Sequence, residues 1–460
     1  MRGRAKPVQN RINRLKRHLG ETMTLDGREI SYDEAITEVI QHCVRSANKK
    51  LQSGWQMTTN EIALSYPATY TSAQRQRLIE LAEKASLADG TQVHVSGTIA
   101  EPAAAGLDYL SRFGSDKETT VLVYDLGGGT FDLALVALYP KGRTNGDGDY
   151  YYDILAVDGL EDVGGGEFDE IMYQLIEQKL QVPLNPSHKA ALRAEAEKIK
   201  KDLTFDAYAD AEVLYNNEYL TVRVTREEFE TASRELLMRT IEATKKMFER
   251  HSNQKPETII LTGGASQMPM VKRALEEAFP EYKGDEMKHK EDKIQISNPS
   301  RAIADGAARY GTAEAMNDIA EKAEAASVVQ TRVGYDLGIR FYHSVDDESG
   351  YISTYIPAGT PIPYQAAYQN STTLHEDQRY SGFTVYEANK AHPDSEQVAE
   401  DYTEIMKVSL DHGREVPKGT RNESRLCIDK LGVLTIEARE ADHPEKPIKS
   451  TVELKNLSKS

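Results

Sequence analysis

Residues 119–136, TTVLVYDLGGGTFDLALV, contain two apolar runs separated by three glycines. The first run is rich in β-branched residues and ends at Asp125, and the second begins at Phe131. This pattern predicts a strand, a tight turn and a second strand. Because glycines lack Cβ atoms, the N–H groups of Gly127–Gly129 can approach an anion closely, and Asp125 and Asp132 can hold a hydrated magnesium ion beside it. The stretch predicts a phosphate-binding hairpin; an ordinary hairpin with a flexible turn is the alternative when it is taken alone.

The length and composition of the chain indicate a multidomain globular protein. A chain of 460 residues suggests two or three domains, and a hydrophobic content of 39% is ordinary for such proteins. No window is long and apolar enough to span a bilayer, and no signal-peptide core is present, so we expect no membrane partner. The two cysteines, Cys43 and Cys427, lie far apart and match neither a metal site nor a disulfide framework. A cytoplasmic location is the simplest expectation.

The charge distribution argues against a nucleic-acid partner. The chain has 56 basic and 73 acidic residues, and its formal charge of −17 would repel nucleic acid. A basic concentration precedes Glu21, and an organelle transit peptide is a minority interpretation of it, because the serines usual in such a peptide are lacking. Its members are Arg2, Arg4, Lys6, Arg11, Arg14, Lys16 and Arg17.

Most of the chain before residue 310 alternates between helical and strand patterns. We expect helices at 33–51, 72–87, from Phe168, and at 190–203, 226–251 and 270–279, and strands at 61–66, 93–99, 150–158, 211–214, 219–224 and 258–261. Further glycine turns, Gly164–Gly166 and Gly263–Gly264, lie next to predicted helix starts, where free N–H groups can bind a phosphate or a sugar. Alternating strands and helices favour an α/β layer domain.

After Tyr335 the pattern changes to a period of two residues, with Pro, Gly, Asn and Asp between short runs. We expect strands at 351–356, 383–386, 404–410, 425–429 and 433–439. Regularly spaced short strands favour a separate antiparallel β domain. The predicted division is therefore 1–325 for the α/β domain, 326–335 for an interdomain linker and 336–460 for the β domain.

The glycine turns and the β domain together make the chain similar to the heat-shock protein 70 family of ATP-dependent chaperones. The shared motifs match that family in order and spacing over most of the first 310 residues, and 336–339, 356–363 and 431–438 resemble its peptide-binding sandwich. The earlier motifs are 15–20 (LKRHLG), 67–68 with 73–76, 101–105 (EPAAA), 125–132, 164–169, 262–264 with Pro269, and 298–299 with 305–308.

This resemblance implies an α/β fold with an actin-like ATPase domain, two-lobed and built on ribonuclease H-like subdomains, followed by an antiparallel β-sandwich that binds substrate. It implies hydrolysis of ATP to ADP with Mg²⁺, coupled to the binding of unfolded or extended hydrophobic peptides. A J-domain co-chaperone, a nucleotide-exchange factor and a role in protein folding under stress would follow. The alternatives are a catalytically weakened nucleotide- or peptide-binding adaptor of the same family, and a sugar kinase or polyphosphatase on the same fold, against which the β domain argues.

The resemblance assigns the phosphate end of the nucleotide to the hairpin. Gly127–Gly129 would hold the β- and γ-phosphates, with Thr130 beside them. Asp125 and Asp132 would position the hydrated magnesium and the attacking water. Lys16 would reach the γ-phosphate and stabilise charge in the transition state; a solvated lysine in a basic run is the alternative.

The resemblance also implies a path from the nucleotide to the β domain. Glu101 would sense the nucleotide, with Pro102 as the switch beside it, and Arg75 would relay the signal. A strand-end acid and a surface arginine without these roles are the alternatives. In the β domain, Ile339 would face the peptide if it matches the pocket residue of the family, and a core position is an equal alternative.

The adenosine end is assigned to a helix and a turn of the second lobe. Glu197 and Lys200 share one face of the helix 190–203 and would meet ribose hydroxyls, although an ordinary charged helix face has the same spacing. Lys201 and Gln267 stand where the family has arginines stacked on adenine; they stack less well, which predicts a reduced affinity. The predicted cofactor site is completed by Gly164, Gly165, Gly263 and Gly264.

Three departures from the family lead to further expectations. The family opens with a strand and a phosphate loop of Asp-Leu-Gly-Thr-Thr type, and this sequence starts after them, so we expect a fragment or a misplaced start codon, and severely weakened hydrolysis otherwise. The linker Ser327–Thr331 lacks the leucine run and the acidic residue that the family uses to dock onto the ATPase domain, so the resemblance does not carry interdomain coupling over to this chain. The helical lid is missing after Glu453, so bound peptide should exchange quickly.

Overall fold

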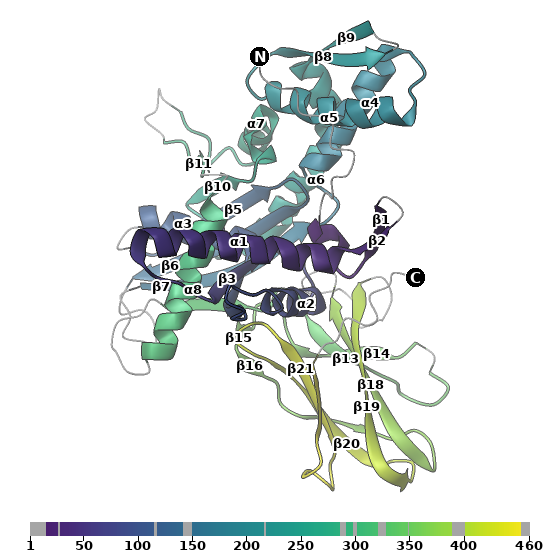
Figure 1. The fold of residues 1–460 in the computed structure, drawn as a ribbon. Coiled ribbons are helices and arrows are strands. Elements are labelled where there is room, and N and C mark those ends of the chain that lie inside the picture. The colour runs from purple at the N-terminus through teal and green to yellow at the C-terminus, as the bar shows by residue number, and fades with distance from the viewer. Residues whose placement is uncertain are drawn as a thin grey trace.

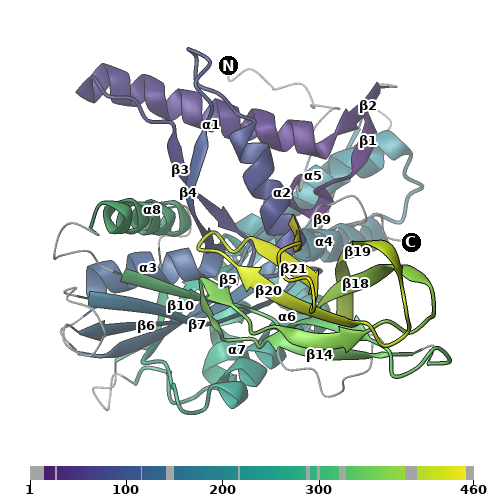
Figure 2. The ribbon, with the colours of Figure 1, turned by 90° about the horizontal axis from the view of Figure 1, so that it is seen from below.

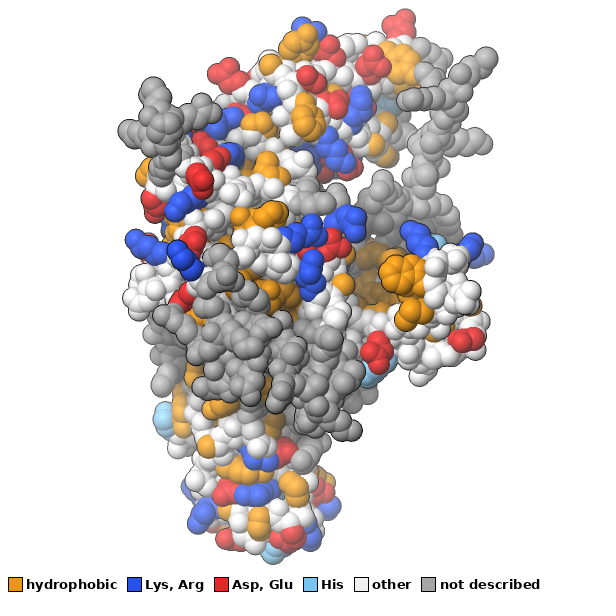
Figure 3. All heavy atoms as spheres, turned by 90° about the vertical axis from the view of Figure 1, so that its left-hand side faces the viewer, with side chains coloured by type: hydrophobic (Ala, Val, Ile, Leu, Met, Phe, Trp, Pro, Cys, Tyr) orange, Lys and Arg blue, Asp and Glu red, His pale blue; other side chains and the backbone are white. Residues whose placement is uncertain are grey.

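The computed structural model shows an α/β part made of two lobes, with a β domain extending from one end of it (Figure 1). The residues that the structure describes are 15–25, 28–114, 117–140, 150–215, 218–285, 291–297, 301–320, 328–347, 349–388 and 401–451. Among the helices of these segments, none combines the length and the apolar composition needed to cross a lipid bilayer. Basic and acidic side chains are interspersed on the face shown in Figure 3.

A seven-stranded mixed sheet forms the centre of the α/β part, in the order β11-β10-β5-β6-β7-β12-β15. The strands β5 and β6 are antiparallel, with Asp125 opposite Asp132, which confirms the predicted hairpin. The strand β10 pairs with β5 in parallel on the other side. The bounds are β5 Thr119–Leu126, β6 Phe131–Pro140, β7 Tyr150–Leu160, β10 Thr258–Thr262, β11 Ile294–Ile296, β12 Val328–Arg332 and β15 Pro361–Ile362.

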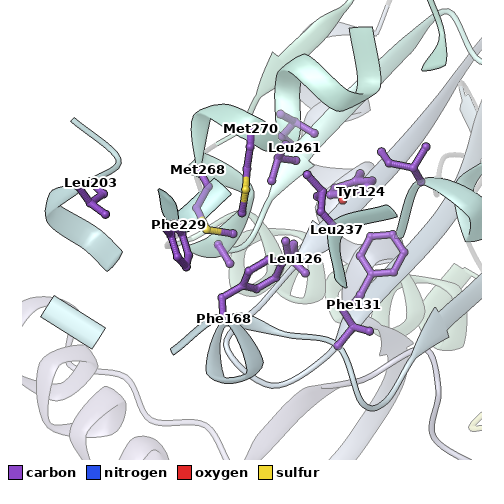
Figure 4. Packing of buried hydrophobic residues seen from close by; sticks show 14 of the residues in the cluster. Tyr124, Leu126, Phe131, Phe168, Leu203, Phe229, Leu237, Leu261, Met268 and Met270 are labelled. Carbon is purple, nitrogen blue, oxygen red and sulfur yellow. The ribbon is translucent and has the colours of Figure 1, made fainter. Parts of the chain in front are cut away.

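Helices cover both faces of this sheet because its central strands are apolar on both sides (Figure 2). Val121 and Val123 pack with α3 (Glu101–Phe113) and α8 (Ala302–Ala320). On the opposite face, Tyr124 belongs to a larger cluster with residues of α4 (Gly165–Leu180), α6 (Arg226–Arg250) and α7 (Pro269–Ala278). Figure 4 shows the aromatic and methionine side chains of that cluster, which anchors the strand that leads into the glycine loop.

The second lobe contains the helices that follow the glycine turns. Its elements are α4 Gly165–Leu180, α5 Pro186–Asp202, β8 Tyr208–Tyr215, β9 Glu218–Thr225, α6 Arg226–Arg250, η2 Ala265–Gln267 and α7 Pro269–Ala278. The helix α5 begins earlier than predicted, because the Asn185 side chain accepts the N–H of His188 and Pro186 fits the first helical position.

The first lobe is built around a long helix and a two-stranded parallel sheet. Its elements are η1 Leu15–His18, β1 Thr22–Leu25, β2 Arg28–Ser31, α1 Tyr32–Trp55, β3 Glu61–Tyr66, α2 Ser72–Glu83 and β4 His94–Ala100. The helix α2 ends at Glu83 instead of the predicted position 87, because Ala85 and Leu87 turn into an apolar cluster with Val44 and Val93.

The β domain consists of two antiparallel sheets that enclose an apolar cluster including Leu337, Val385 and Leu426. One sheet has the order β14-β13-β18-β19, and the other β16-β20-β21-β22 with β17 also pairing with β20. The bounds are β13 Leu337–Phe341, β14 Tyr351–Ile356, β16 Tyr364–Gln365, β17 Gln369–Thr372, β18 Gln378–Ala388, β19 Tyr402–Val416, β20 Arg421–Ile428, β21 Leu434–Glu440 and β22 Ile448–Thr451.

The segment predicted as a linker contains a strand. Residues 328–332 form β12, which pairs in parallel with β7 and antiparallel with β15. Val329 is buried in the cluster under α3 and α8, so apolar burial accompanies the backbone pairing. The central sheet therefore runs from the α/β part into the chain of the β domain. The turn expected at 145–148 and the motif at 298–299 lie outside the described residues.

Candidate functional site

The glycine loop between β5 and β6 keeps part of its backbone free for a ligand. The N–H of Gly127 donates to the carbonyl of Thr130 at 3.0 Å, which closes the turn. The N–H groups of Gly128 and Gly129 donate to no carbonyl of the described residues outside regular helices and strands. Successive free amides of this kind form an anion-binding concavity. The structure thus places the predicted phosphate loop at the ends of two central strands of the sheet, where it lines a cavity.

The start of α4 braces this loop from behind. The N–H groups of Gly165 and Gly166 donate to the carbonyls of Gly127 and Gly128 at 2.8 and 3.0 Å. A Cβ atom on Gly164 would lie 2.5 Å from the carbonyl carbon of Gly129, so only glycine allows this approach. Gly164 and Gly165, which were predicted to bind the cofactor, therefore shape the loop, because the amide of Gly165 is already used.

The turn after β10 is packed equally closely against the end of β5. Gly263 has a φ of +78°, and a Cβ atom there would lie 2.3 Å from Oδ1 of Asp125. The Ser266 hydroxyl accepts the N–H of Leu126 at 3.0 Å, which ties the two strands together beyond their last ladder pair. Gly264 and Gln267 line the same cavity as the glycine loop.

Three buried carboxyl groups converge on the loop. Asp125, Asp132 and Glu101 are 4%, 2% and 8% exposed. Burial, followed by the charges of Asp132 and Glu101, raises the pKa of Asp125 well above its usual range. Burial raises the pKa of Asp132 to about 7, although the Thr130 hydroxyl and the Ala68 amide donate to it at 2.5 and 2.7 Å. Without a bound cation, the site opposes its own ionisation.

These carboxyl groups fit a magnesium ion held through water. The described residues contain no cluster of three or more acids, histidines or cysteines close enough to ligate a metal directly. Burial, and with it the neighbouring acids, raises the pKa values of Asp125 and Asp132, and a hydrated divalent cation beside a phosphate would favour their charged forms. Asp125 and Asp132 are the residues that would hold it.

Two basic residues of η1 reach the loop from the first lobe. The Lys16 ammonium forms a close ion pair with Glu101, and the Tyr70 hydroxyl donates to the Lys16 carbonyl at 2.7 Å. Arg17 donates through both terminal nitrogens to Glu167 of α4, at 2.8 and 3.0 Å. The sequence interpretation included Lys16 and Glu101 but not Arg17 or Glu167. Their positions beside Lys16 and in the first turn after Gly164 were the available signals.

The loops open into one cavity of about 2740 Å³ between the lobes. It is larger than the roughly 300–1,000 Å³ of a typical ligand pocket. Its lining includes Lys16 and the glycine loop on one side, and Gln267 and the exposed face of α5 on the other. Most of the predicted phosphate and adenosine residues therefore face a common space. The predicted residues that lie behind its lining are Asp125, Asp132, Gly164 and Gly263.

At the predicted adenosine end, the charged residues of α5 have partners within the chain. The Lys200 ammonium is buried, pairs with Asp169 at 2.6 Å and donates to the Gly165 carbonyl at 2.8 Å. It therefore supports the glycine turn, and because it also lines the cavity, its contact with a ribose stays a prediction. Glu197 pairs with Lys201 at 2.7 Å on the exposed helix face.

An aromatic residue that the sequence interpretation missed stands at this end of the cavity. Phe205 follows α5, is 81% exposed and lines the cavity together with Lys201 and Gln267. Its N–H donates to the carbonyl of Asp202 at 3.0 Å, so a turn fixes its backbone. A phenylalanine in the middle of an acidic, polar segment was the signal available in the sequence.

The first lobe contacts the β domain through a buried polar joint. Arg75 and Glu387 are both buried, with Nη2 and Oε1 at 4.0 Å, and the N–H of Ser72 donates to Glu387 at 2.8 Å. Nearby, the Thr98 hydroxyl donates to the carbonyl of Leu431 at 2.8 Å. Arg75, predicted as a relay and alternatively as a surface arginine, is thus buried at the contact between the domains. Pro102 lies in the first turn of α3 beside Glu101.

A second joint holds β12. Arg332 donates to both carboxylate oxygens of the buried Asp153 on β7, at 2.7 and 2.5 Å, and to the carbonyl of Gly359 at 3.0 Å. The linker is thus docked through β12 although it lacks the family's leucine run, while the expectation for interdomain coupling stays a prediction. The family pattern suggested an acidic residue on the linker, whereas here the linker supplies the cation and the α/β part supplies the acid.

The peptide-binding residue predicted in the β domain lies in the core. Ile339 on β13 is fully buried and belongs to the cluster of Leu337 and Val385. Its side chain faces the interior between the sheets, so the core alternative describes its position here. Period-two patterns identify a face of a strand but not which face is covered.

A comparison with protein families matches this architecture. The family model described as Hsp70 protein matches residues 5–459, nearly the whole chain. The mixed α/β part with its large sheet and the β domain fit an actin-like ATPase followed by a β-sandwich. Members of this family are in general ATPases that bind nucleotide with Mg²⁺ and act as chaperones on unfolded peptides. The chain belongs to the heat-shock protein 70 family.

Proposed function

We propose that this chain is an ATP-dependent chaperone that binds magnesium-ATP in the cleft between its lobes, hydrolyses it and couples this to peptide binding by the β domain. The observation that carries the proposal is the convergence of three buried acids on a glycine loop. Such like-charged burial is unfavourable by itself and is typical of sites that bind a cation with an anionic ligand.

Each residue of the site has a role in this proposal. The amides of Gly128 and Gly129 bind phosphate oxygens, and Asp125 and Asp132 hold the hydrated magnesium. Magnesium, when bound, neutralises the phosphate charge that opposes attack by water. Lys16 stabilises negative charge on the terminal phosphate, for which it must exchange its partner Glu101 for the phosphate.

The two interdomain joints support the coupling. Glu101 begins α3, which packs under the sheet that carries β12, and Arg75 lies in the contact with the β domain. We propose that loss of the Lys16–Glu101 ion pair alters the contacts at these joints, and that Pro102 stiffens the start of α3. Unfolded or extended hydrophobic peptides are the proposed substrates, and a J-domain co-chaperone and an exchange factor the proposed partners. The proposed location is the cytoplasm.

The test combines binding and turnover measurements on the full chain. We expect magnesium-dependent heat on titration with ATP and steady-state hydrolysis that rises when a permanently unfolded protein is added. Lys16→Ala should lower the hydrolysis rate by about 10²–10³-fold, the loss typical for one group that stabilises transition-state charge. Lys84→Ala, at the end of α2, is the matched control. A folded chain that gives no heat with magnesium-ATP would refute the proposal.

A nucleotide-binding adaptor without turnover is the second candidate. It is favoured by one observation, the close ion pair that holds the Lys16 ammonium on Glu101. In that case ATP would bind with measurable heat, while hydrolysis would equal that of buffer and would not respond to Lys16→Ala.

A further inference from the structure

Arg17 is a cation at the glycine loop that has no role in the site as described so far. It follows Lys16 in η1, and its side chain is 20% exposed. Its terminal nitrogens are both used by Glu167, but its Nε is buried and has no hydrogen-bond partner. The fork of the guanidinium is therefore fixed while one N–H remains available.

The available N–H lies beside the phosphate loop. A Cβ atom built on Gly129 would be 3.6 Å from Arg17 Nε, the nearest atom found around that glycine. The amides of Gly128 and Gly129 donate to no described carbonyl outside regular elements, and both glycines line the same cavity as Arg17. A buried guanidinium N–H and free loop amides thus converge on one position, which suits an anionic oxygen.

Arg75, at the joint between the domains, also has a buried Nε without a partner, so the distinguishing feature of Arg17 is that its Nε lies beside the glycine loop. Arg239 and Asp162 form a pair similar to that of Arg17 at 2.8 Å on the surface, where their side chains are 44% and 69% exposed and water can satisfy the remaining donors. Arg17 instead keeps a donor where solvent does not reach it, and a buried donor without an acceptor is unfavourable.

We propose that Arg17 is a phosphate-binding residue: its Nε donates to the polyphosphate of the bound nucleotide while Glu167 keeps its fork in place. Because η1 belongs to the first lobe and α4 to the second, the bound phosphate then joins both lobes through one side chain. This inference rests on the proposed nucleotide binding and adds to it a second cation, distinct from Lys16, that recognises the phosphate chain and not the nucleoside.

The test compares nucleotides that differ only in their phosphates. Calorimetric titration of the full chain with magnesium-ATP, magnesium-ADP and AMP should show that Arg17→Gln weakens ATP and ADP about tenfold to a hundredfold, as expected for one hydrogen bond to a charged group. The affinity for AMP should change less than threefold. Arg17→Lys keeps the charge but lacks the fork and Nε–H, and should recover only part of the loss.

Two further variants separate the contact from its support. Glu167→Gln should weaken ATP by a smaller factor, because the Arg17 fork loses its charged partner but Nε–H remains. Arg239→Gln should leave every affinity unchanged. A melting temperature of Arg17→Gln close to that of the parent chain, without nucleotide, will show that the variant is folded.

The outcomes distinguish this inference from the function it rests on. If the parent chain binds ATP and Arg17→Gln binds it equally well, only the role of Arg17 is refuted. Equal losses for AMP and ATP would assign Arg17 to the support of the lobes and also refute the role. If the parent chain binds none of the three nucleotides, the proposed function is refuted together with it.

Discussion

Buried charge occurs in two regions of this molecule, and it is arranged in opposite ways. At the glycine loop, Asp125, Asp132 and Glu101 have the same sign, and burial raises the pKa of both aspartates. At the joints between the domains, acid meets base, as in the contact of Arg75 with Glu387. The two aspartates have only other acids and one paired lysine close by, so a cation from outside the chain would favour their ionised forms, whereas each acid of the joints has a base beside it within the chain. The first is the arrangement of a ligand site, the second that of a docking surface.

The largest expected effect comes from leaving one charge of a joint unpaired. Arg75→Ala leaves Glu387 buried without its cation, which should cost about 3–5 kcal/mol of docking free energy. Hydrogen exchange of the β12 amides should then accelerate, because the β domain spends more time undocked. Arg75→Met combined with Glu387→Leu removes both charges and should retain most of the protection. Unchanged exchange in Arg75→Ala would show that the joint does not hold the domains.

The like-charged cluster gives the opposite response, because removing a charge there should stabilise the chain. A carboxyl group whose folded pKa is raised contributes stability at low pH that is lost as the pH rises through the folded value, here about 7 for Asp132. Asp132→Asn removes that loss. Without magnesium, the free energy of unfolding of this variant should exceed that of the parent chain at pH 8. This excess should be about 3 kcal/mol larger at pH 8 than at pH 5. A difference that is the same at both pH values would contradict the buried charge.

The linker joint tests whether the pairing or the particular residues matter. Arg332→Gln should weaken docking of β12 by about 2 kcal/mol, since it removes a two-pronged hydrogen bond to a buried carboxylate. Exchanging the two residues, Arg332→Asp with Asp153→Arg, should restore part of the hydrogen-exchange protection of β12. If the exchanged pair protects no better than Arg332→Gln alone, the contact depends on the backbone and not on charge.

The smallest effect is expected at the base end of the cavity, where neither arrangement of buried charge operates. Phe205→Ala should weaken ATP by about 1 kcal/mol and leave inorganic triphosphate unaffected, because stacking on an aromatic ring is lost. Tyr208→Ala, an exposed aromatic that does not line the cavity, is the matched control. Equal calorimetric affinities of Phe205→Ala and the parent chain for ATP would exclude stacking.

The sequence predicted best what depends on short stretches of chain. The hairpin of β5 and β6 is marked by its glycines and β-branched runs, and the start of α6 by the reciprocal bonds of Thr225 and Glu228, a capping box that the structure confirms. Such features are fixed within a few residues, so a local pattern is enough to find them.

The features that could not be predicted from the sequence depend on which other residues pack against a given residue. The spacing of Lys200 places it on one helix face with Glu197, but does not reveal its ion pair with Asp169 of α4. Ile339 alternates correctly for a strand, yet only the second sheet decides that it is covered. The strand β12 has no strong pattern of its own, and its partners lie about 180 residues earlier and 30 later in the chain.

The continuous sheet across β7, β12 and β15 implies an order of events when the two domains part. The strand β15 shares only two residue pairs with β12, whereas β12 shares three with β7 and also has the grip of Arg332 on Asp153. Separation should therefore begin with loss of the β12–β15 pairing, and the β12–β7 pairing should be lost last. A force that pulls the β domain away should break the two pairings in two successive steps, and the second step should need the larger force.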